Sequence, residues 1–262
     1  MRPSPFREAV APLRLLAVEV APLAVDEVAA AVAAWSAAGE ARVVCCANVH
    51  MAMEAWDDPG FAALLDDADL VVCDGRPLVW VCRLLGRRDA AHARGLDVLQ
   101  ACCALAARRG LRVGLYGGRP EVLAAVRSRL EGSHRGLVVA AAISPPFRDL
   151  SPAEEAADLA ALREAGVQVL FVSLGCPRQE RWMLAHRDAL PAVQVGVGAA
   201  FDMLAGALPV APRWVQRLGL EWLVRLASEP RRLWRRYARH NWRFVREAAR
   251  QIVSERLAGP GR

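Results

Sequence analysis

The sequence contains no lysine, because all 34 residues counted as Lys or Arg are arginine. Against 28 acidic residues, this gives a formal net charge of +6. A basic surface of this kind indicates an anionic partner, such as a nucleotide phosphate, a nucleic acid or an acidic lipid.

Long apolar runs and paired cysteine motifs are also missing. No run of about 18 apolar residues is free of charge, so we expect no membrane-spanning helix. Residues 1–13 lack the apolar core and cleavage pattern of a signal peptide. The seven cysteines are odd in number, lie mostly in apolar contexts and form no C-x-x-C pair. These absences predict buried thiols in a reducing cytosol and hence a cytoplasmic protein.

What the chain does have is an alternation of strand-like and helix-like segments up to about residue 200. It is 55% hydrophobic over 262 residues, enough for a sizeable core. The alternation predicts an α/β fold, a Rossmann-like, mostly parallel sheet with helices on both faces. The expected strands are residues 15–20, 42–47, 70–73, 111–116, 137–142, 167–172 and 193–197.

Polar residues follow the last two of these strands. The strand 167–172 leads through a Gly/Pro turn to Gln179 on the first turn of a helix, and 193–197 leads to Phe201 and Asp202. Ligands of open α/β sheets bind at the carboxyl ends of strands. A structural interpretation stays open for each residue, since Asp202 could simply cap a helix.

Two further strands end in residues suited to a site. Asp74 follows its strand directly and is well placed as a general base, which typically contributes about 10²–10⁴-fold. The structural alternative is that Asp74 caps the helix that starts near Pro77. Tyr116, Gly117 and Gly118 also follow a strand, and glycines there permit close backbone approach by a ligand. Their spacing is not that of a dinucleotide fingerprint.

No metal site and no cofactor are expected. Asp67-Ala68-Asp69 matches a short metal-binding pattern of nucleotide-sugar enzymes, but it precedes its strand and is interpreted as a solvated turn. Cys176 lies near a helix start without a nearby histidine partner, so it is interpreted as a turn residue and not as a nucleophile. The histidines are scattered with no H-x-x-x-H spacing: His50, His92, His134, His186 and His240.

The composition changes after Pro209. Residues 213–250 hold eleven arginines, three glutamates and four tryptophans, and Pro230 is expected to divide them into two helices. The second predicted helix is basic and amphipathic with aromatic anchors, which favours a membrane surface over nucleic acid as its partner. Its basic stripe is Arg232, Arg235, Arg239, Arg243, Arg246 and Arg250, and its apolar side is Trp234, Tyr237, Val245, Ala249 and Ile252. We therefore expect a Rossmann-like core at 1–208 and a basic, membrane-associating helical appendage at 209–262.

The order and spacing of several motifs resemble the WecG/TagA/CpsF family of bacterial glycosyltransferases (glycosyltransferase family 26, N-acetylmannosaminyltransferase-like). The motifs are VVCCAN at 43–48, ADLVVCDG at 68–75, RGLD at 94–97, YGG at 116–118, LGCPRQE at 174–180, GVGAAFD at 196–202, APRW at 211–214 and LGLEWL at 218–223. The resemblance implies a metal-independent, inverting enzyme. Such an enzyme moves an N-acetylmannosamine-type or related hexose from a UDP-sugar to a polyprenyl-diphosphate-linked saccharide, in teichoic acid-type or exopolysaccharide synthesis.

The resemblance also implies roles for individual residues. It assigns the base to Asp74, active-site amides to Asn48 and Gln179, and the donor pocket to Phe201 and Asp202. In the family the appendage docks on the inner face of the cell membrane and brings arginines to the diphosphate; these match Arg225, Arg232 and Arg235. Cys46 stands where the family commonly has threonine, and a thiol donates a weaker hydrogen bond than a hydroxyl.

Two other functions remain open on the sequence. A nucleotide-dependent oxidoreductase would need a glycine fingerprint near the first strand, and residues 15–26 have none. A nucleic-acid-binding protein would use the Arg/Trp tail. The expected partners are a UDP-sugar, a lipid-linked acceptor and the membrane surface, without nucleic acid; whether the chain forms a homo-oligomer is left open.

Overall fold

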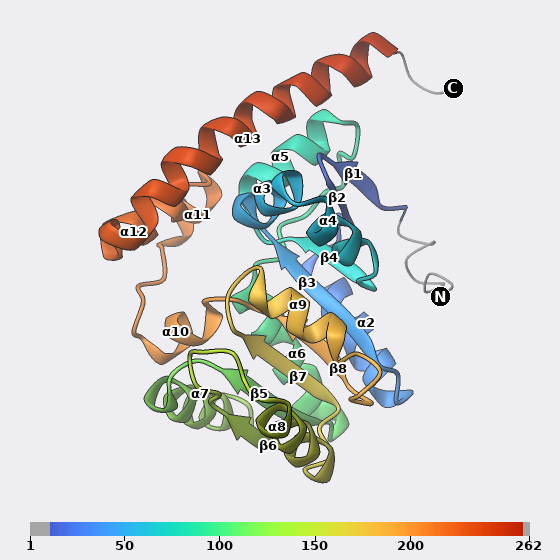
Figure 1. The fold of residues 1–262 in the computed structure, drawn as a ribbon, viewed down its shortest axis with the longest axis vertical. Helices are drawn as coiled ribbons and strands as arrows, with labels where there is room; N and C mark the ends of the chain where they lie inside the picture. The colour runs from blue at the N-terminus through green and yellow to red at the C-terminus, as the bar shows by residue number, and fades with distance from the viewer. Residues whose placement is uncertain (1–10, 259–262) are drawn as a thin grey trace. The chain divides into compact units, whose positions relative to one another are not determined.

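The computed structural model describes residues 11–258 (Figure 1). Residues 1–10, on which the expectation about a signal peptide largely rests, lie outside the described residues. The chain divides into two compact units. The first unit comprises Met1–Ala24, Ala47–Arg94 and Pro209–Arg262, and the second comprises Val25–Cys46 and Gly95–Leu208. The basic tail thus belongs to the same compact unit as residues 47–94.

The parallel sheet predicted from the sequence is present. It has six strands in the order β4-β3-β8-β7-β5-β6, and the pairs β3-β8, β8-β7, β7-β5 and β5-β6 are all parallel. All except the edge strand β6 are almost continuously buried, which explains why their sequences are plain apolar runs. The strands are β3 (Arg42–Ala47), β4 (Leu70–Cys73), β5 (Arg112–Gly117), β6 (Val138–Ile143), β7 (Val169–Ser173) and β8 (Val193–Gly196).

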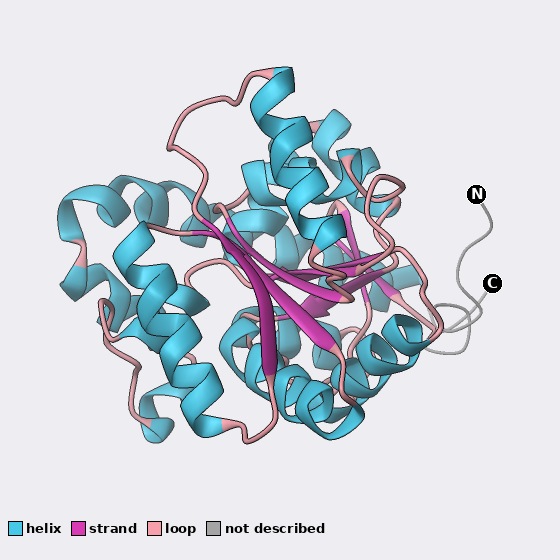
Figure 2. Ribbon diagram, turned by 90° about the horizontal axis from the view of Figure 1, so that it is seen from below, coloured by secondary structure: helices cyan, strands magenta, loops and turns pink. Residues whose placement is uncertain are grey.

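In the second unit, helices lie on both faces of the sheet, as predicted (Figure 2). Helices α2, α6 and α7 cover one face, and α8 and α9 cover the other. The helices of this unit are α2 (Val25–Ala37), α6 (Gly95–Arg109), α7 (Pro120–Ser133), α8 (Pro152–Glu164), α9 (Arg178–Ala185) and α10 (Ala200–Ala205). Helix α8 begins with a complete capping box, in which Ser151 and Glu154 bond each other's backbone N–H groups.

The first unit begins with a hairpin where the sequence predicts one strand over residues 15–20. Strands β1 (Leu13–Leu15) and β2 (Val18–Val20) pair antiparallel and form a separate two-stranded sheet. The prediction was wrong because Leu16 turns the chain in a left-handed conformation, φ 53°, with no Gly or Asn to mark the turn. A distant side chain holds this turn, since Gln251 accepts from the Leu16 N–H at 2.8 Å and donates to the Arg14 carbonyl at 2.8 Å.

The remaining helices of the first unit are α3 (Val49–Asp57), α4 (Pro59–Asp66), α5 (Arg76–Leu84), α11 (Arg213–Arg217), α12 (Glu221–Ser228) and α13 (Pro230–Ala258). Pro230 starts α13, as expected, but the tail has three helices and not two. Gly219, with φ 67°, separates α11 from α12, and a Cβ there would lie 2.5 Å from Cη2 of Trp80. No helix within residues 11–258 is both long and apolar enough to span a bilayer.

Helix α13 has a buried face that the sequence pattern did not distinguish. It packs against α3 and α5 within the first unit, and its buried residues are Leu233, His240, Phe244, Glu247 and Ala248. Trp234 and Val245, from the predicted apolar side, are 53% and 58% exposed. The apolar side therefore does not form the packing surface of this helix.

Candidate active site

Asn48 ends β3 and begins α3 in the first unit. It is the N-cap of α3, and its side-chain oxygen accepts hydrogen bonds from the backbone N–H groups of His50 at 3.0 Å and Met51 at 3.3 Å. The cap therefore uses the amide oxygen and leaves the amide nitrogen as the group suited to donate to a ligand.

Asp74 lies beside Asn48 through backbone contacts. The Asp74 N–H donates to the carbonyl of Ala47 at 2.8 Å, and the Gly75 N–H donates to the same oxygen at 3.2 Å. A Cβ on Gly75 would lie 3.4 Å from Cα of Asn48, within ordinary contact distance, so the two backbones are neighbours here. Gly75, and not Asp74, is the N-cap residue of α5. The structural alternative, that Asp74 occupies the N-cap position of this helix, is therefore wrong.

The loop before α6 runs alongside Asp74 and was missed as part of the site by sequence reasoning. Nε2 of His92 contacts the Asp74 carbonyl oxygen, and the Ala93 N–H donates to the Cys73 carbonyl at 2.9 Å. Arg94 then donates to Glu221 of α12 at 3.0 Å, and its side chain is 11% exposed. The only sequence signal was the Arg-Gly pair that opens the following helix.

In the second unit, the carboxyl ends of β5 and β7 approach closely. Gly117 has φ 106°, and a Cβ on it would lie 2.4 Å from the Ser173 carbonyl oxygen. The Ser144 hydroxyl donates to the carbonyl of Gly118 at 2.6 Å. Gly117 thus allows the backbone of β5 to approach the backbone of β7 closely. This packing is a structural reason for glycine at this position.

The Tyr116 side chain is part of the buried core. It is fully buried, its hydroxyl donates to Asp158 at 2.8 Å, and its ring stacks on Trp182 with centroids 4.3 Å apart. Burial is the largest cause of a strongly raised pKa of this hydroxyl. The role of Tyr116 toward substrate stays a prediction, as it does for Gly117 and Gly118.

Gln179 and Glu180 lie on the first turn of α9, as predicted, and both are buried. Gln179 accepts from the Gly198 N–H at 3.0 Å and donates to Glu180 at 2.8 Å. Burial raises the pKa of Glu180, which is 0% exposed. Through its bond with the Gly198 N–H, Gln179 connects α9 to the turn that follows β8. Its predicted role toward substrate stays a prediction.

Phe201 and Asp202 belong to a helix and not to a turn. They lie in the first turn of α10, whose N-cap is Ala199, so Asp202 is not the cap. The Phe201 ring is fully buried, and its Cδ2 would lie 3.6 Å from a Cβ on Gly118. The structure thus brings Phe201 and Gly118 together, while Asp202 remains half-buried.

The two cysteines singled out in the sequence differ in burial. Cys46 is 6% exposed and lies at the end of β3, next to Cys45, which pairs with Gly196 of β8. Cys176 is partly exposed and precedes Pro177, the N-cap residue of α9. Cys46 thus lies near the carboxyl edge of the sheet, where the sequence predicted it.

The tail arginines differ in what their guanidinium groups contact. Arg232 donates to Glu229 at 2.5 Å, and Arg235 lies over the Trp234 ring at 5.4 Å. Nε of Arg225 is buried and has no hydrogen-bond partner within residues 11–258. A buried N–H without an acceptor suits an anionic ligand, so Arg225 fits its predicted role best of the three.

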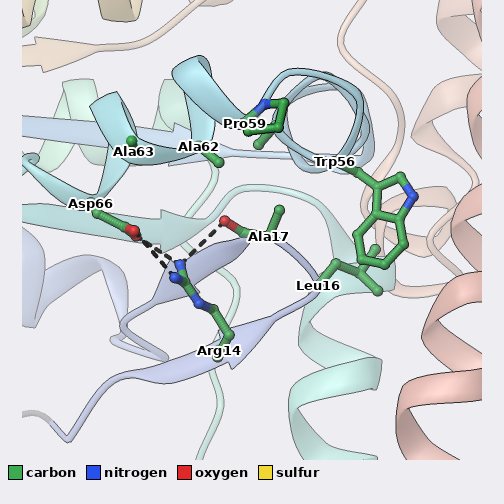
Figure 3. Close-up of a pocket in the computed structure, with 9 residues that line it drawn as sticks. Arg14, Leu16, Ala17, Trp56, Pro59, Ala62, Ala63 and Asp66 are labelled. Atoms are coloured by element: carbon green, nitrogen blue, oxygen red, sulfur yellow. Dashed lines mark hydrogen bonds and ion pairs between the residues drawn. The ribbon is translucent and has the colours of Figure 1, made fainter.

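Other candidate features lie outside these groups. Asp67 is exposed and caps the end of α4, but Asp69 is only 6% exposed, so the predicted solvated turn is wrong for Asp69. A shallow pocket in the first unit is lined by Leu16, Trp56 and Ala62, with Arg14 bonded to Asp66 at its edge (Figure 3). It contains none of the predicted site residues.

The Glycosyl transferase WecG/TagA/CpsF family matches residues 13–258 of the chain. The chain therefore belongs to this family and is a glycosyltransferase, which confirms the resemblance and removes the oxidoreductase interpretation. One relative is the N-acetylglucosaminyldiphosphoundecaprenol N-acetyl-beta-D-mannosaminyltransferase of Bacillus subtilis (strain 168). It is 29% identical over 195 residues, which cover 74% of each chain.

Proposed function

We propose that this glycosyltransferase moves an N-acetylmannosamine-type or related hexose from a UDP-sugar to a polyprenyl-diphosphate-linked saccharide, with inversion and without a catalytic metal. The product would be an intermediate of a cell-surface polysaccharide or teichoic acid-type polymer. The observation that carries the proposal is the placement of Asp74 beside Asn48, within a chain that matches the family almost end to end. The name of the Bacillus subtilis relative supports the type of sugar and of lipid-linked acceptor.

In the proposed reaction, the Asp74 carboxylate accepts the proton of the acceptor hydroxyl as its oxygen attacks the anomeric carbon. The bond to the UDP oxygen breaks on the opposite side, so the configuration at the anomeric carbon inverts. Asn48 donates from its amide nitrogen to the sugar. Contact between His92 and the Asp74 backbone holds the base-bearing loop in place.

The departing diphosphate carries developing negative charge. Arginine forks and backbone N–H groups can meet this charge without a metal ion. The proposed arginines are Arg225, Arg232 and Arg235, all on the tail. Arg232 would have to exchange its exposed pair with Glu229 for the phosphate, which costs little because exposed ion pairs contribute only about 0–1 kcal/mol.

The donor would bind at the carboxyl edge of the sheet in the second unit. Gly117, Gly118, Phe201 and Asp202 line the proposed donor region, and Gln179 fixes the turn before α10 through Gly198. Cys46 supplies a thiol where the family commonly has a hydroxyl. If a donor sugar accepts a hydrogen bond at this position, a Cys46→Thr variant should therefore bind that donor more tightly than the parent does.

We further propose that residues 209–262 dock this enzyme peripherally on the cytoplasmic face of the membrane. Helix α13 exposes Trp234, Trp242 and Val245, and Arg239 and Arg246 lie on adjoining surface. Exposed tryptophans beside arginines suit the boundary between headgroups and acyl chains. The exposed large apolar residues of the tail are Val210, Trp214, Leu218, Leu223, Trp234, Trp242, Val245, Val253 and Leu257.

A panel of UDP-sugars with a lipid-diphosphate sugar acceptor tests the proposed function. The Asp74→Asn variant should lose about 10²–10⁴-fold in turnover with an unchanged thermal unfolding midpoint. Asp149→Asn, at an exposed position, is the matched control and should keep parental turnover. Omission of Mg²⁺ and Mn²⁺ from the assay should leave transfer unchanged. Turnover by Asp74→Asn within about twofold of the parent would remove the base assignment.

Nucleic-acid binding remains the second candidate for the tail. The parent protein should co-sediment with anionic liposomes. An oligonucleotide at the same phosphate concentration should not displace it from the liposomes at physiological salt. Stronger retention by the oligonucleotide would favour the nucleic-acid interpretation.

A further inference from the structure

Helices α3 and α13 bring together three residues with metal-binding side chains. His50 and Glu54 lie four positions apart on α3 and therefore on one face of that helix. His240 belongs to the buried face of α13 and is 6% exposed. The two helices pack against each other within the first unit (Figure 1). His240 lies far from His50 and Glu54 in the sequence, which is why the scattered histidines predicted no metal site.

The distances in this cluster are too long for direct hydrogen bonds. Oε1 of Glu54 lies 3.6 Å from Nδ1 of His50 and 3.6 Å from Nε2 of His240. Hydrogen bonds from N–H to oxygen measure about 2.7–3.2 Å. Two ligand atoms around a tetrahedral ion with bonds of about 2.0–2.1 Å lie roughly 3.4 Å apart. The spacing of Glu54 from each histidine thus suits ligands that share one ion.

We propose that His50, Glu54 and His240 bind a divalent transition-metal ion, with Zn²⁺ as the favoured occupant, and so fasten α13 to α3. One ligand atom from each residue lies within 4.8 Å of the other two, so small side-chain rotations close the site. Two imidazoles and one carboxylate form a donor set typical of zinc, with water as the fourth ligand. The ion would join the two helices, and the proposal does not depend on the transfer reaction proposed above.

The surroundings of the cluster bear on its charge. Arg239 and Arg243 flank His240 on α13, and their positive charge alone would oppose a cation. Both donate to Asp57, which lies at the end of α3, at 3.3 Å and 2.7 Å respectively. Asp57 therefore offsets the arginines, and the Glu54 carboxylate remains to balance the ion.

The site would act on the element that positions a predicted catalytic residue. Asn48 caps α3 only two residues before His50. An ion at His50, Glu54 and His240 would therefore link the packing of α13 against α3 to the position of the N-terminus of α3, where Asn48 lies. In its absence, packing and the Asp57 ion pairs alone would hold the two helices together.

Metal binding to the full-length protein tests the proposal. After chelation and dialysis, Zn²⁺ titration by calorimetry should give one equivalent of binding. A Zn²⁺ concentration about 100-fold above the dissociation constant should raise the thermal unfolding midpoint by about 5 °C. Co²⁺ should bind at the same stoichiometry without a thiolate charge-transfer band, which excludes the seven cysteines as ligands.

Two variants and one control make the result decisive. His240→Gln and Glu54→Gln should each lose at least about tenfold in Zn²⁺ affinity and the associated rise in unfolding temperature. Their unfolding midpoints in chelator should stay close to that of the metal-free parent, which shows that they fold. His134→Gln, on the second unit, should bind Zn²⁺ like the parent. Failure of the parent to bind Zn²⁺, or undiminished binding by both variants, would overturn the site.

Discussion

At the scale of single residues, burial changed the meaning of several predicted positions. Gln179 and Glu180 were correctly predicted on the first turn of a helix, since a strand followed by a Gly/Pro turn fixes that placement. The sequence could not show that both are buried and bonded to each other, because burial depends on contacts with other elements. The bond from Tyr116 to Asp158 could not be predicted for the same reason, since the two residues lie 42 positions apart.

The buried carboxyl of Glu180 predicts a pH-dependent effect. Its folded-state pKa lies above the ordinary value of 4.5, because burial disfavours the charged form. The folded protein therefore binds more protons than the unfolded chain above about pH 4.5, and this group lowers stability as pH rises through that window. Glu180→Gln removes this loss. The difference in unfolding temperature between this variant and the parent should increase from pH 4 to pH 7 in calorimetric scans, in favour of the variant.

Glu121→Gln, at an exposed position, provides the control for this prediction and should show no such trend. A Glu180→Gln variant whose relative stability fell between pH 4 and pH 7 would contradict the assigned cause.

Gly196 predicts a steric effect at the same place. A Cβ there would lie 2.5 Å from Nε2 of Gln179 and 2.8 Å from Cε of Met183. Gly196→Ala should therefore destabilise the protein by about 1–3 kcal/mol, as overpacking typically does. Gly132→Ala, in α7 with no atom within 4 Å of the new methyl, should be neutral or stabilising by up to about 1 kcal/mol. Chemical denaturation of both variants measures the difference.

At the scale of elements, local patterns predicted what local forces determine. The six strands of the parallel sheet were found because each is a short apolar run, mostly buried except in β6, and α8 was found through its capping box. The β1-β2 hairpin was missed because Leu16 gives no turn signal and Gln251 supplies the hydrogen bonds from α13. Likewise, the apolar side expected on α13 is exposed, since α3 and α5 pack against a different face.

Helix α3 gives a prediction that separates capping from catalysis. Asn48→Asp keeps an oxygen for the cap and suits the helix dipole, but it loses the amide donor. This variant should keep the parental unfolding midpoint and lose at least about tenfold in turnover. Asn48→Ala should lose turnover and also about 0.5–2 kcal/mol of stability. Parental turnover by Asn48→Asp would show that Asn48 acts only as a cap.

At the scale of the whole molecule, the grouping of segments was beyond the reach of sequence patterns. The first unit collects three separate segments, and its tail joins residues 47–94, which contain both Asn48 and Asp74. The sequence did predict the change of composition after Pro209. It could not predict that His240 would meet His50, because no periodicity links positions so far apart.

The proposed membrane docking predicts that the exposed tryptophans of α13 contribute to lipid binding. Trp234→Ala and Trp242→Ala should each weaken binding to anionic liposomes by about 1–2 kcal/mol, or roughly tenfold, because each removes an exposed apolar anchor. Trp56→Ala, exposed on α3 outside the tail, should bind like the parent. Liposome flotation over a range of salt concentrations measures both. Equal binding by all four proteins would contradict the proposed membrane contact of α13.

The hydrogen bonds between Gln251 and the first hairpin have a consequence for biosynthesis. The Leu16 N–H and its acceptor are separated by 235 residues, so at about 5–20 residues per second a ribosome needs tens of seconds to deliver the second partner. The second unit is translated in full by Leu208, whereas the first unit waits for its last segment. The β1-β2 hairpin therefore lacks its hydrogen bonds to Gln251 until translation is nearly finished. A premature stop before Gln251 would release a chain in which these bonds never form.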